Sequence, residues 1–265
     1  MSRVFTNNLD SRLLAMLGMT LAAVLALVIH GPIPQSAAYH AFADQRSYWG
    51  IPNSIDTLSN LSFLLVGSAG LFALRRGVPA GALPALRPAY LVYFAGAALL
   101  FPTSGYYHLW PANETLLWDR LAMTVAFMAF LAIVMGEYIE PRLGIRLLVP
   151  LVALGMGSIA YWRLTDGGDG GDLRPYVLVQ FLPMLLIPFI ALTYRPLLRP
   201  VWYLWALLAC YGLAKLFELL DEPILDLTQY VSGHSLKHLA AALGIGFFLL
   251  GLYQRRPEGR CVLDP

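Results

Sequence analysis

The chain alternates between long apolar runs and short polar segments. Eight stretches of about 20 residues are almost continuously hydrophobic, and each ends where Gly, Pro or charged residues gather. A helix of about 20 residues crosses the roughly 30 Å hydrocarbon core of a bilayer. We therefore predict membrane-spanning helices at about 13–30, 54–74, 88–108, 115–137, 144–162, 175–194, 200–220 and 234–254.

The composition supports this interpretation. Hydrophobic residues make up 58% of the 265 positions and charged residues 13%, and the mean hydropathy is +0.63. Soluble domains average roughly 45–50% and about 25% for these two classes. Eight spans leave only about 105 positions for connections, which excludes a large soluble domain, a disordered chain and a nucleic-acid-binding protein. With only two cysteines the chain has no disulfide framework. We expect one all-α membrane domain over residues 1–265.

The distribution of Lys and Arg predicts the orientation. Of the 18 basic residues, twelve fall on one side of the predicted topology, three on the other and three within spans. Basic residues concentrate on the cytoplasmic side of membrane proteins, so both termini are predicted to be cytoplasmic. The twelve are Arg3, Arg12, Arg75, Arg76, Arg87, Arg142, Arg146, Arg195, Arg199, Arg255, Arg256 and Arg260.

The first apolar run has two interpretations. Arg3 and Arg12 precede it, and the small residues around Phe42 resemble a signal-peptide cleavage site. Against cleavage, the run is long for a signal peptide, and the cleavage-like site lies about 13 residues beyond its end. We therefore expect residues 13–30 to remain as an extra N-terminal helix.

Ionisable residues inside spans are energetically costly and mark functional sites by default. His234 and His238 are four positions apart, which places both imidazoles on one face of a helix. Such a pair can chelate a transition metal, with zinc favoured by nitrogen ligands. Alone, the pair is equally typical of two interfacial histidines.

Three more polar residues are expected near the histidine pair, namely Ser104, His108 and Asp119. Ser104 and His108 are again four apart, and Asp119 follows in the next predicted helix. The topology places His108, Asp119 and the histidine pair near the outer ends of their spans. Three imidazoles with an open fourth position form the ligand set of a hydrolytic zinc site, so we predict a zinc site here.

These motifs together resemble those of the alkaline ceramidases. The segments are Ser104-Gly-Tyr-Tyr-His108, Asp119 and His234-Ser-Leu-Lys-His238. That family belongs to a wider group of membrane hydrolases, often called CREST, that includes the PAQR receptors. The motifs occur in the same helix order as in that family, except that the extra first helix of this chain moves each motif one helix further along. Residues 42–60 are similar to the bacterial branch of the family. The resemblance covers residues 40–254 and implies a seven-helix core.

The resemblance implies a role for each motif residue. His108, His234 and His238 would bind Zn²⁺, which activates a water. Asp119 would act as general base, and Ser104 would donate a hydrogen bond to the developing oxyanion. A nucleophilic Ser104 is the alternative, although a base that serves the water makes it unnecessary.

Two further polar groups have competing interpretations. Animal members of the family carry a Ca²⁺ site before the first core helix, where this chain has Asp44, Asn53 and Asp56. These are oxygen ligands in type, but they equally suit helix capping or support of the zinc ligands.

A second polar face lies near the outer end of the seventh span. Lys215, Glu218 and Asp221 lie on it, and the first two are spaced to form an ion pair. The alternative role is to bind a lipid headgroup.

The function implied is hydrolysis of the N-acyl bond of ceramide or a related membrane lipid. Two alternatives remain: a receptor-like or lipid-sensing protein that keeps the zinc, and a hydrolase of a lipid ester. The compact loops and the bacterial-type segment favour a bacterial inner membrane, with the zinc site toward the periplasm. The oligomeric state is left open.

Overall fold

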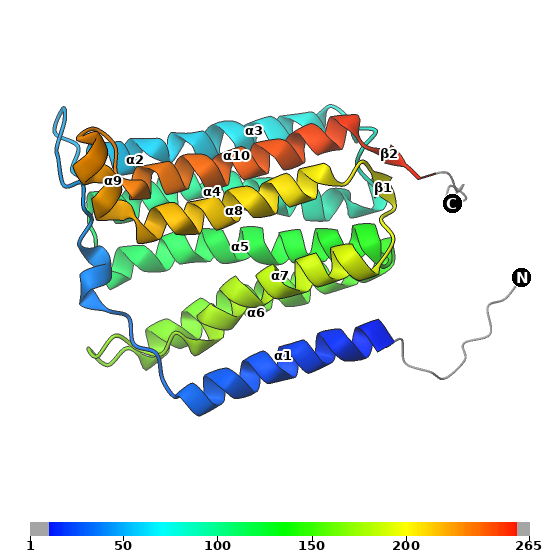
Figure 1. The fold of residues 1–265 in the computed structure, drawn as a ribbon, viewed down its shortest axis with the longest axis horizontal. Helices are drawn as coiled ribbons and strands as arrows, with labels where there is room; N and C mark the ends of the chain where they lie inside the picture. The colour runs from blue at the N-terminus through cyan, green and yellow to red at the C-terminus, as the bar shows by residue number, and fades with distance from the viewer. Residues whose placement is uncertain (1–10, 259–265) are drawn as a thin grey trace, which may run out of the picture.

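The computed structural model describes residues 11–258 and is an all-α helix bundle (Figure 1). Its long helices are α1 (Ser11–His30), α3 (Leu61–Arg75), α4 (Arg87–Leu109), α5 (Asn113–Tyr138), α6 (Pro141–Thr165), α7 (Arg174–Thr193), α8 (Trp202–Leu219) and α10 (Gly233–Gln254). The short elements are α2 (Ser54–Ser59), α9 (Asp221–Thr228), the 3₁₀ helices η1 (Ala37–His40) and η2 (Pro84–Leu86), and the strands β1 (Leu198–Arg199) and β2 (Arg256–Pro257). The two strands pair antiparallel, with Leu198 opposite Pro257.

The predicted spans agree with these helices. Seven helical segments are long and apolar enough to cross a membrane, with α2 and α3 counted as one, so the chain is a multi-pass integral membrane protein. The seventh predicted span, 200–220, is the exception, because α8 and α9 meet at a bend of 78° and reach the criterion only together. Pro223 lies in the first turn of α9, and a proline there disfavours continuation of the preceding helix through the bend.

Helix α5 forms the centre of the bundle. Of the spans it has the largest buried share, and it packs against α4, α6 and α7. Small residues permit this close packing, as membrane helices require. A side chain at Gly96 of α4 would approach the backbone nitrogen of Ala126 in α5 to 3.0 Å. The interior is filled with aromatic rings, including those of Tyr93, Phe130 and Phe248.

Helix α1 lies apart from the rest of the bundle (Figure 1). It packs against α7, and Met16 is its one buried residue. Its exposed leucines suit contact with lipid, as expected for an extra helix outside the core.

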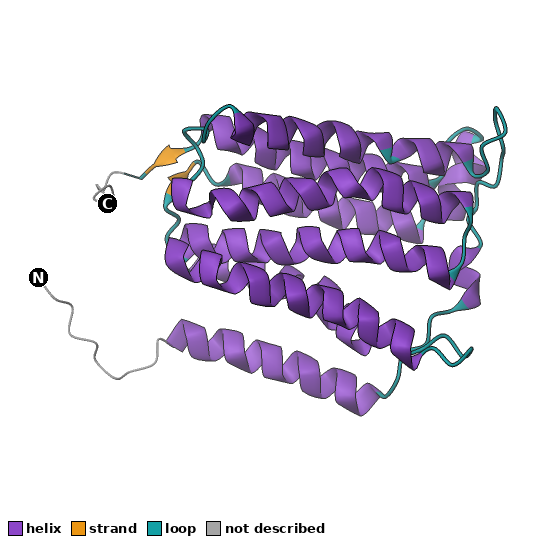
Figure 2. Cartoon of the chain, turned by 180° about the vertical axis from the view of Figure 1, so that it is seen from behind, coloured by secondary structure: helices purple, strands orange, loops and turns teal. Residues whose placement is uncertain are grey.

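The two ends of the bundle differ in character (Figure 2). One end carries the start of α1 and the paired strands, and nearby a buried ion pair joins Arg255 to Glu137 at 2.7 Å. The opposite end carries η1, α2 and α9 (Figure 1). The predicted zinc ligands lie at this second end, because α4 ends there at Leu109 and α10 begins there at Gly233.

Candidate metal centre

The first turn of α10 is held in place by several contacts. The Ser232 hydroxyl caps the helix by accepting a hydrogen bond from the Ser235 amide at 3.0 Å, and Asp221 Oδ1 accepts one from the His234 amide at 2.8 Å. Any side chain at Gly233 would collide with the carbonyl of Phe217, so the glycine permits close contact with α8. Together these contacts fix the direction in which the His234 imidazole leaves the helix.

His108 lies in the last turn of α4 and is buried. Its backbone carbonyl accepts a hydrogen bond from Asn53 Nδ2 at 2.7 Å. The Phe42 ring lies 4.6 Å from the His108 ring and 5.0 Å from the His234 ring, measured between centroids. The segment before α2 therefore lies directly against these two imidazoles.

The three predicted ligands meet at one point. One nitrogen of each of His108, His234 and His238 can be chosen so that all lie within 4.8 Å of one another, and all three residues are buried. The ring centroids are 4.8 to 5.1 Å apart. Among residues 11–258 these histidines are the one group of three or more such donors found.

Unpartnered ring nitrogens show that the group fits a metal ion. His108 Nδ1 and His234 Nε2 are buried and have no hydrogen-bond partner. A buried polar atom without a partner costs about 1–3 kcal/mol, and a cation bound between the rings would satisfy both lone pairs. Neutral imidazole nitrogens suit zinc among the common metals.

Ser59 determines which nitrogen of His238 is available. Its hydroxyl donates to the Asp56 carbonyl at 2.8 Å and lies 2.7 Å from His238 Nδ1. A hydroxyl has a single proton, so the Ser59 oxygen accepts from Nδ1–H and leaves Nε2 with its lone pair free. Nothing in the sequence marks Ser59, because its contact with His238 depends on how α2 packs against α10.

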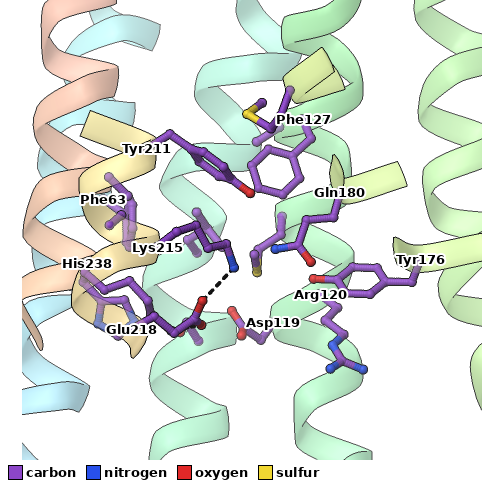
Figure 3. Close-up of a pocket in the computed structure, with 18 of the residues that line it drawn as sticks. Phe63, Asp119, Arg120, Phe127, Tyr176, Gln180, Tyr211, Lys215, Glu218 and His238 are labelled. Atoms are coloured by element: carbon purple, nitrogen blue, oxygen red, sulfur yellow. Dashed lines mark hydrogen bonds and ion pairs between the residues drawn. The ribbon is translucent and has the colours of Figure 1, made fainter. Parts of the chain in front are cut away.

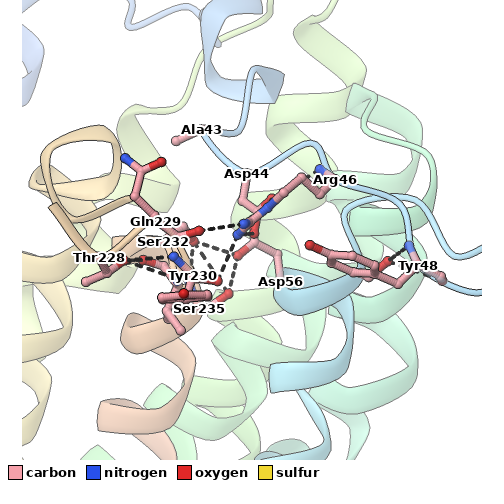
Figure 4. Close-up of polar contacts among 12 residues, drawn as sticks. Ala43, Asp44, Arg46, Tyr48, Asp56, Thr228, Gln229, Tyr230, Ser232 and Ser235 are labelled. Atoms are coloured by element: carbon pink, nitrogen blue, oxygen red, sulfur yellow. Dashed lines mark hydrogen bonds and ion pairs between the residues drawn. The ribbon is translucent and has the colours of Figure 1, made fainter. Parts of the chain in front are cut away.

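Asp56 supports the same helix start (Figure 4). Its Oδ1 accepts hydrogen bonds from Ser232 at 2.9 Å and from Ser235 at 2.5 Å. The carboxylate thus ties α2 to the first turn of α10, beside the histidine pair. The role of Asp56 in supporting the zinc ligands stays a prediction.

Each residue predicted as a calcium ligand has another partner, although Asp56 Oδ2 is buried without one. Asp44 forms an ion pair with Arg46 at 2.7 Å, Asn53 bonds to the His108 carbonyl, and Asp56 bonds to two serines. Burial by itself raises the pKa of Asp44, but the hydrogen bonds from Arg46 outweigh it and lower that pKa. Arg46 also donates to the carbonyls of Gln229 and Tyr230, so an arginine occupies the polar space around Asp44 (Figure 4). The arrangement gives the calcium interpretation no support.

Ser104 and Asp119 lie beside the histidines. Both are buried, and a side-chain hydrogen bond joins them across α4 and α5. Together with His238 they line a cavity of about 410 Å³ (Figure 3). The pair predicted to be catalytic and one predicted ligand therefore share the wall of a single cavity.

Most of the cavity wall is apolar. Its hydrophobic lining includes Phe63, Tyr93, Leu100, Met123, Phe127, Phe130, Met184, Leu207 and Ile245. A space of this composition suits an acyl chain, since ligand cavities combine an apolar wall with a few placed polar groups.

The second predicted polar face divides between the cavity and its surroundings. Lys215 Nζ lies 2.7 Å from Glu218 Oε2, and Lys237 Nζ lies 3.1 Å from Glu218 Oε1, all within the cavity wall. Lys237 was not predicted as a partner, although it stands inside the histidine motif. Asp221 is not part of the wall, because it bonds to the amides of His234 and Ala43.

Arg120 also lines this cavity and was not predicted as a site residue. Its signal was available in the sequence, since a charged residue within a span is costly.

The chain matches no known protein-family model, and no curated protein matches its sequence. The evidence for the site is therefore the geometry of its residues.

Proposed function

We propose that the protein is a zinc-dependent hydrolase that cleaves the N-acyl bond of ceramide or a related membrane lipid. One observation carries the proposal. Three buried histidines lie together, two of them with an unpartnered nitrogen, and the third, His238, shares the wall of an apolar cavity with a hydrogen-bonded serine and aspartate. A structural zinc site would need neither the serine–aspartate pair nor the cavity.

The histidines would hold the metal, and the remaining groups would act on the substrate. Zinc supplies a Lewis acid that activates water for attack at neutral pH. Asp119 takes the proton of the attacking water and returns it to the nitrogen of the leaving amine. Ser104 turns its hydroxyl from Asp119 to the substrate carbonyl oxygen, where negative charge develops.

The surroundings of the site suit a lipid substrate. The apolar wall receives the acyl chain and excludes bulk water, which strengthens the electrostatic interactions at the amide. A spanning bundle also gives the substrate direct access from the bilayer. We further propose a bacterial inner membrane with cytoplasmic termini, since the basic residues Arg75, Arg87 and Arg142 lie at the end opposite the site.

The test compares zinc content with fatty-acid release from a labelled ceramide, using purified protein in detergent. Asp119→Asn keeps the side-chain shape but removes proton acceptance, so turnover should fall by about 10²–10⁴-fold while zinc stays bound. Ser104→Ala should lose about 10²–10³-fold, also with zinc retained. Glu114→Gln is the matched control, because Glu114 lies on the same helix, is exposed and is distant from the cavity wall.

The metal assignment has its own readout. His234→Ala and His238→Ala should each lose most of the zinc, whereas His30→Ala should retain it, since His30 is exposed at the end of α1. Unchanged turnover in both Asp119→Asn and Ser104→Ala would reject the mechanism. A zinc-loaded wild type that hydrolyses no lipid amide would favour the receptor-like alternative.

A further inference from the structure

Arg120 is a buried cation at the polar end of the cavity. It follows Asp119 on α5, and only 4% of its surface is exposed. Aromatic rings flank its guanidinium, whose carbon lies 4.5 Å from the Trp162 ring and 4.7 Å from the Tyr176 ring. Such faces hold the planar group in one orientation and leave its N–H edges available.

The hydrogen-bonding capacity of Arg120 is incompletely used. Its Nη2 donates to Gln35 Oε1, but its Nη1 is buried and has no partner. Within the described part of the chain, no carboxylate forms an ion pair with it. The other cations of the cavity wall and the buried Arg255 are paired, since both cavity lysines contact Glu218 and Arg255 contacts Glu137. An unpaired buried guanidinium is costly, so this one stands apart from the structural pairs.

The cavity wall as a whole also carries a net positive charge, which favours an anionic ligand. Three basic residues line it, Arg120, Lys215 and Lys237, against the two acidic residues Asp119 and Glu218. Glu218 bridges the two lysines, and Asp119 bonds to Ser104. The wall thus has one positive charge in excess, and an unpartnered donor at Arg120 to receive an anion.

We propose that the preferred substrate is a lipid amide whose amine-side headgroup carries an acid, and that Arg120 Nη1 donates to this acid. This inference rests on the proposed function. Residues near Arg120, such as Gln35 and Tyr39, belong to the outer connection, whereas the long apolar wall extends away from it (Figure 3). The acyl chain therefore lies away from Arg120. Because Asp119 and Arg120 both line the same cavity, the acid lies close to the amide nitrogen.

The test uses two substrates of nearly equal shape, N-palmitoylglycine with a carboxylate and N-palmitoylethanolamine with a neutral hydroxyl. Full-length, zinc-loaded wild type should show at least a 10-fold higher kcat/KM for the acid, since hydrogen bonds to charged groups are worth about 1.5–3 kcal/mol. Arg120→Gln should bring the ratio of the two close to one, mainly through KM, and Arg120→Lys should restore part of it. Arg163→Gln should keep the wild-type ratio, because Arg163 is exposed and lies outside the cavity wall.

Binding to the Asp119→Asn protein gives a second readout that does not need turnover. In titration calorimetry N-palmitoylglycine should bind at least 10-fold more tightly than the neutral amide, and adding Arg120→Gln should remove this difference. Equal or weaker binding and hydrolysis of the acid by proteins that retain Arg120 would overturn the inference while leaving the proposed function intact. Hydrolysis of neither amide, with the binding difference present, would reject the proposed function alone.

A third ligand tests whether Arg120 binds the carboxylate of the headgroup or that of the fatty acid product. Free palmitate carries its acid at the end of the acyl chain, where the amide carbon would be. We expect it to bind at least 10-fold more weakly than N-palmitoylglycine. If palmitate binds equally well and loses affinity to the same extent in Arg120→Gln, Arg120 recognises the fatty acid product and the headgroup assignment is wrong.

Discussion

Ser59→Ala tests how the metal ligands are oriented. In the wild type the Ser59 oxygen lies 2.7 Å from His238 Nδ1, and its proton is used by the Asp56 carbonyl. The substitution removes the acceptor that keeps a proton on Nδ1. Without it, the apo protein can move the proton to Nε2, which is the nitrogen that the metal requires.

The size of the effect follows from this tautomer argument. In the zinc-bound state Nδ1–H is retained and left without its acceptor, in a residue that is only 5% exposed. An unsatisfied buried donor costs about 1–3 kcal/mol, and the apo state avoids this cost by changing tautomer. The whole penalty therefore falls on zinc binding, and affinity should drop by about 10–100-fold.

The assay is zinc affinity of the purified protein, measured by competition with a chelator. Ser62→Ala is the matched control, because Ser62 lies one turn further along and its hydroxyl donates to the Ser59 carbonyl at 2.7 Å instead of contacting a histidine ring. Its zinc affinity should remain within about twofold of wild type, as for surface changes away from a site. Wild-type affinity in Ser59→Ala would show that Ser59 does not set the tautomer of His238.

Three other predictions concern stability and orientation. Glu137→Gln leaves Arg255 buried without its charged partner, so thermal denaturation should show a loss of about 3–5 kcal/mol. Hydrogen bonds, above all from the neighbouring arginine, lower the pKa of Asp172 to about 2, so its stabilising effect is present above pH 3.8 and is lost as pH falls through 2. The stability difference from Asp172→Asn should disappear over that range. A reporter active only in the periplasm should work when fused after Val231 and be silent after Arg256; the reverse would invert the proposed orientation.

The spans were predictable because the bilayer imposes a simple rule on each of them. About 20 apolar residues are needed whatever the neighbouring helices do, so the runs ending near His30 and Leu109 could be found from the sequence alone. The bend between α8 and α9 was not predicted. Its apolar residues continue past Leu220, and the only local signal is Pro223 after two acidic residues.

The site was predictable to the extent that it depends on spacing along one helix. Positions four apart place His234 and His238 together on any α-helix, and the tight turn after His108 brings Asp119 back alongside. The contacts of Ser59 depend on the packing of separate helices, for which the sequence has no periodic signal. The same holds for Asp44, whose oxygen ligand type suggested calcium until its partner Arg46 could be seen.

The polar groups inside the bundle can be divided by whether the protein itself satisfies them. Glu137 with Arg255 is a balanced pair, and Glu218 with two lysines is a set in which each charged group has a partner within the chain. His108 Nδ1, His234 Nε2 and Arg120 Nη1 are among the atoms that differ, because each is buried without a hydrogen-bond partner. They lie at the same end of the bundle, two needing a cation and one an anion. A folded chain that retains this cost at one place is explained if a metal and an acidic lipid amide offset it on binding.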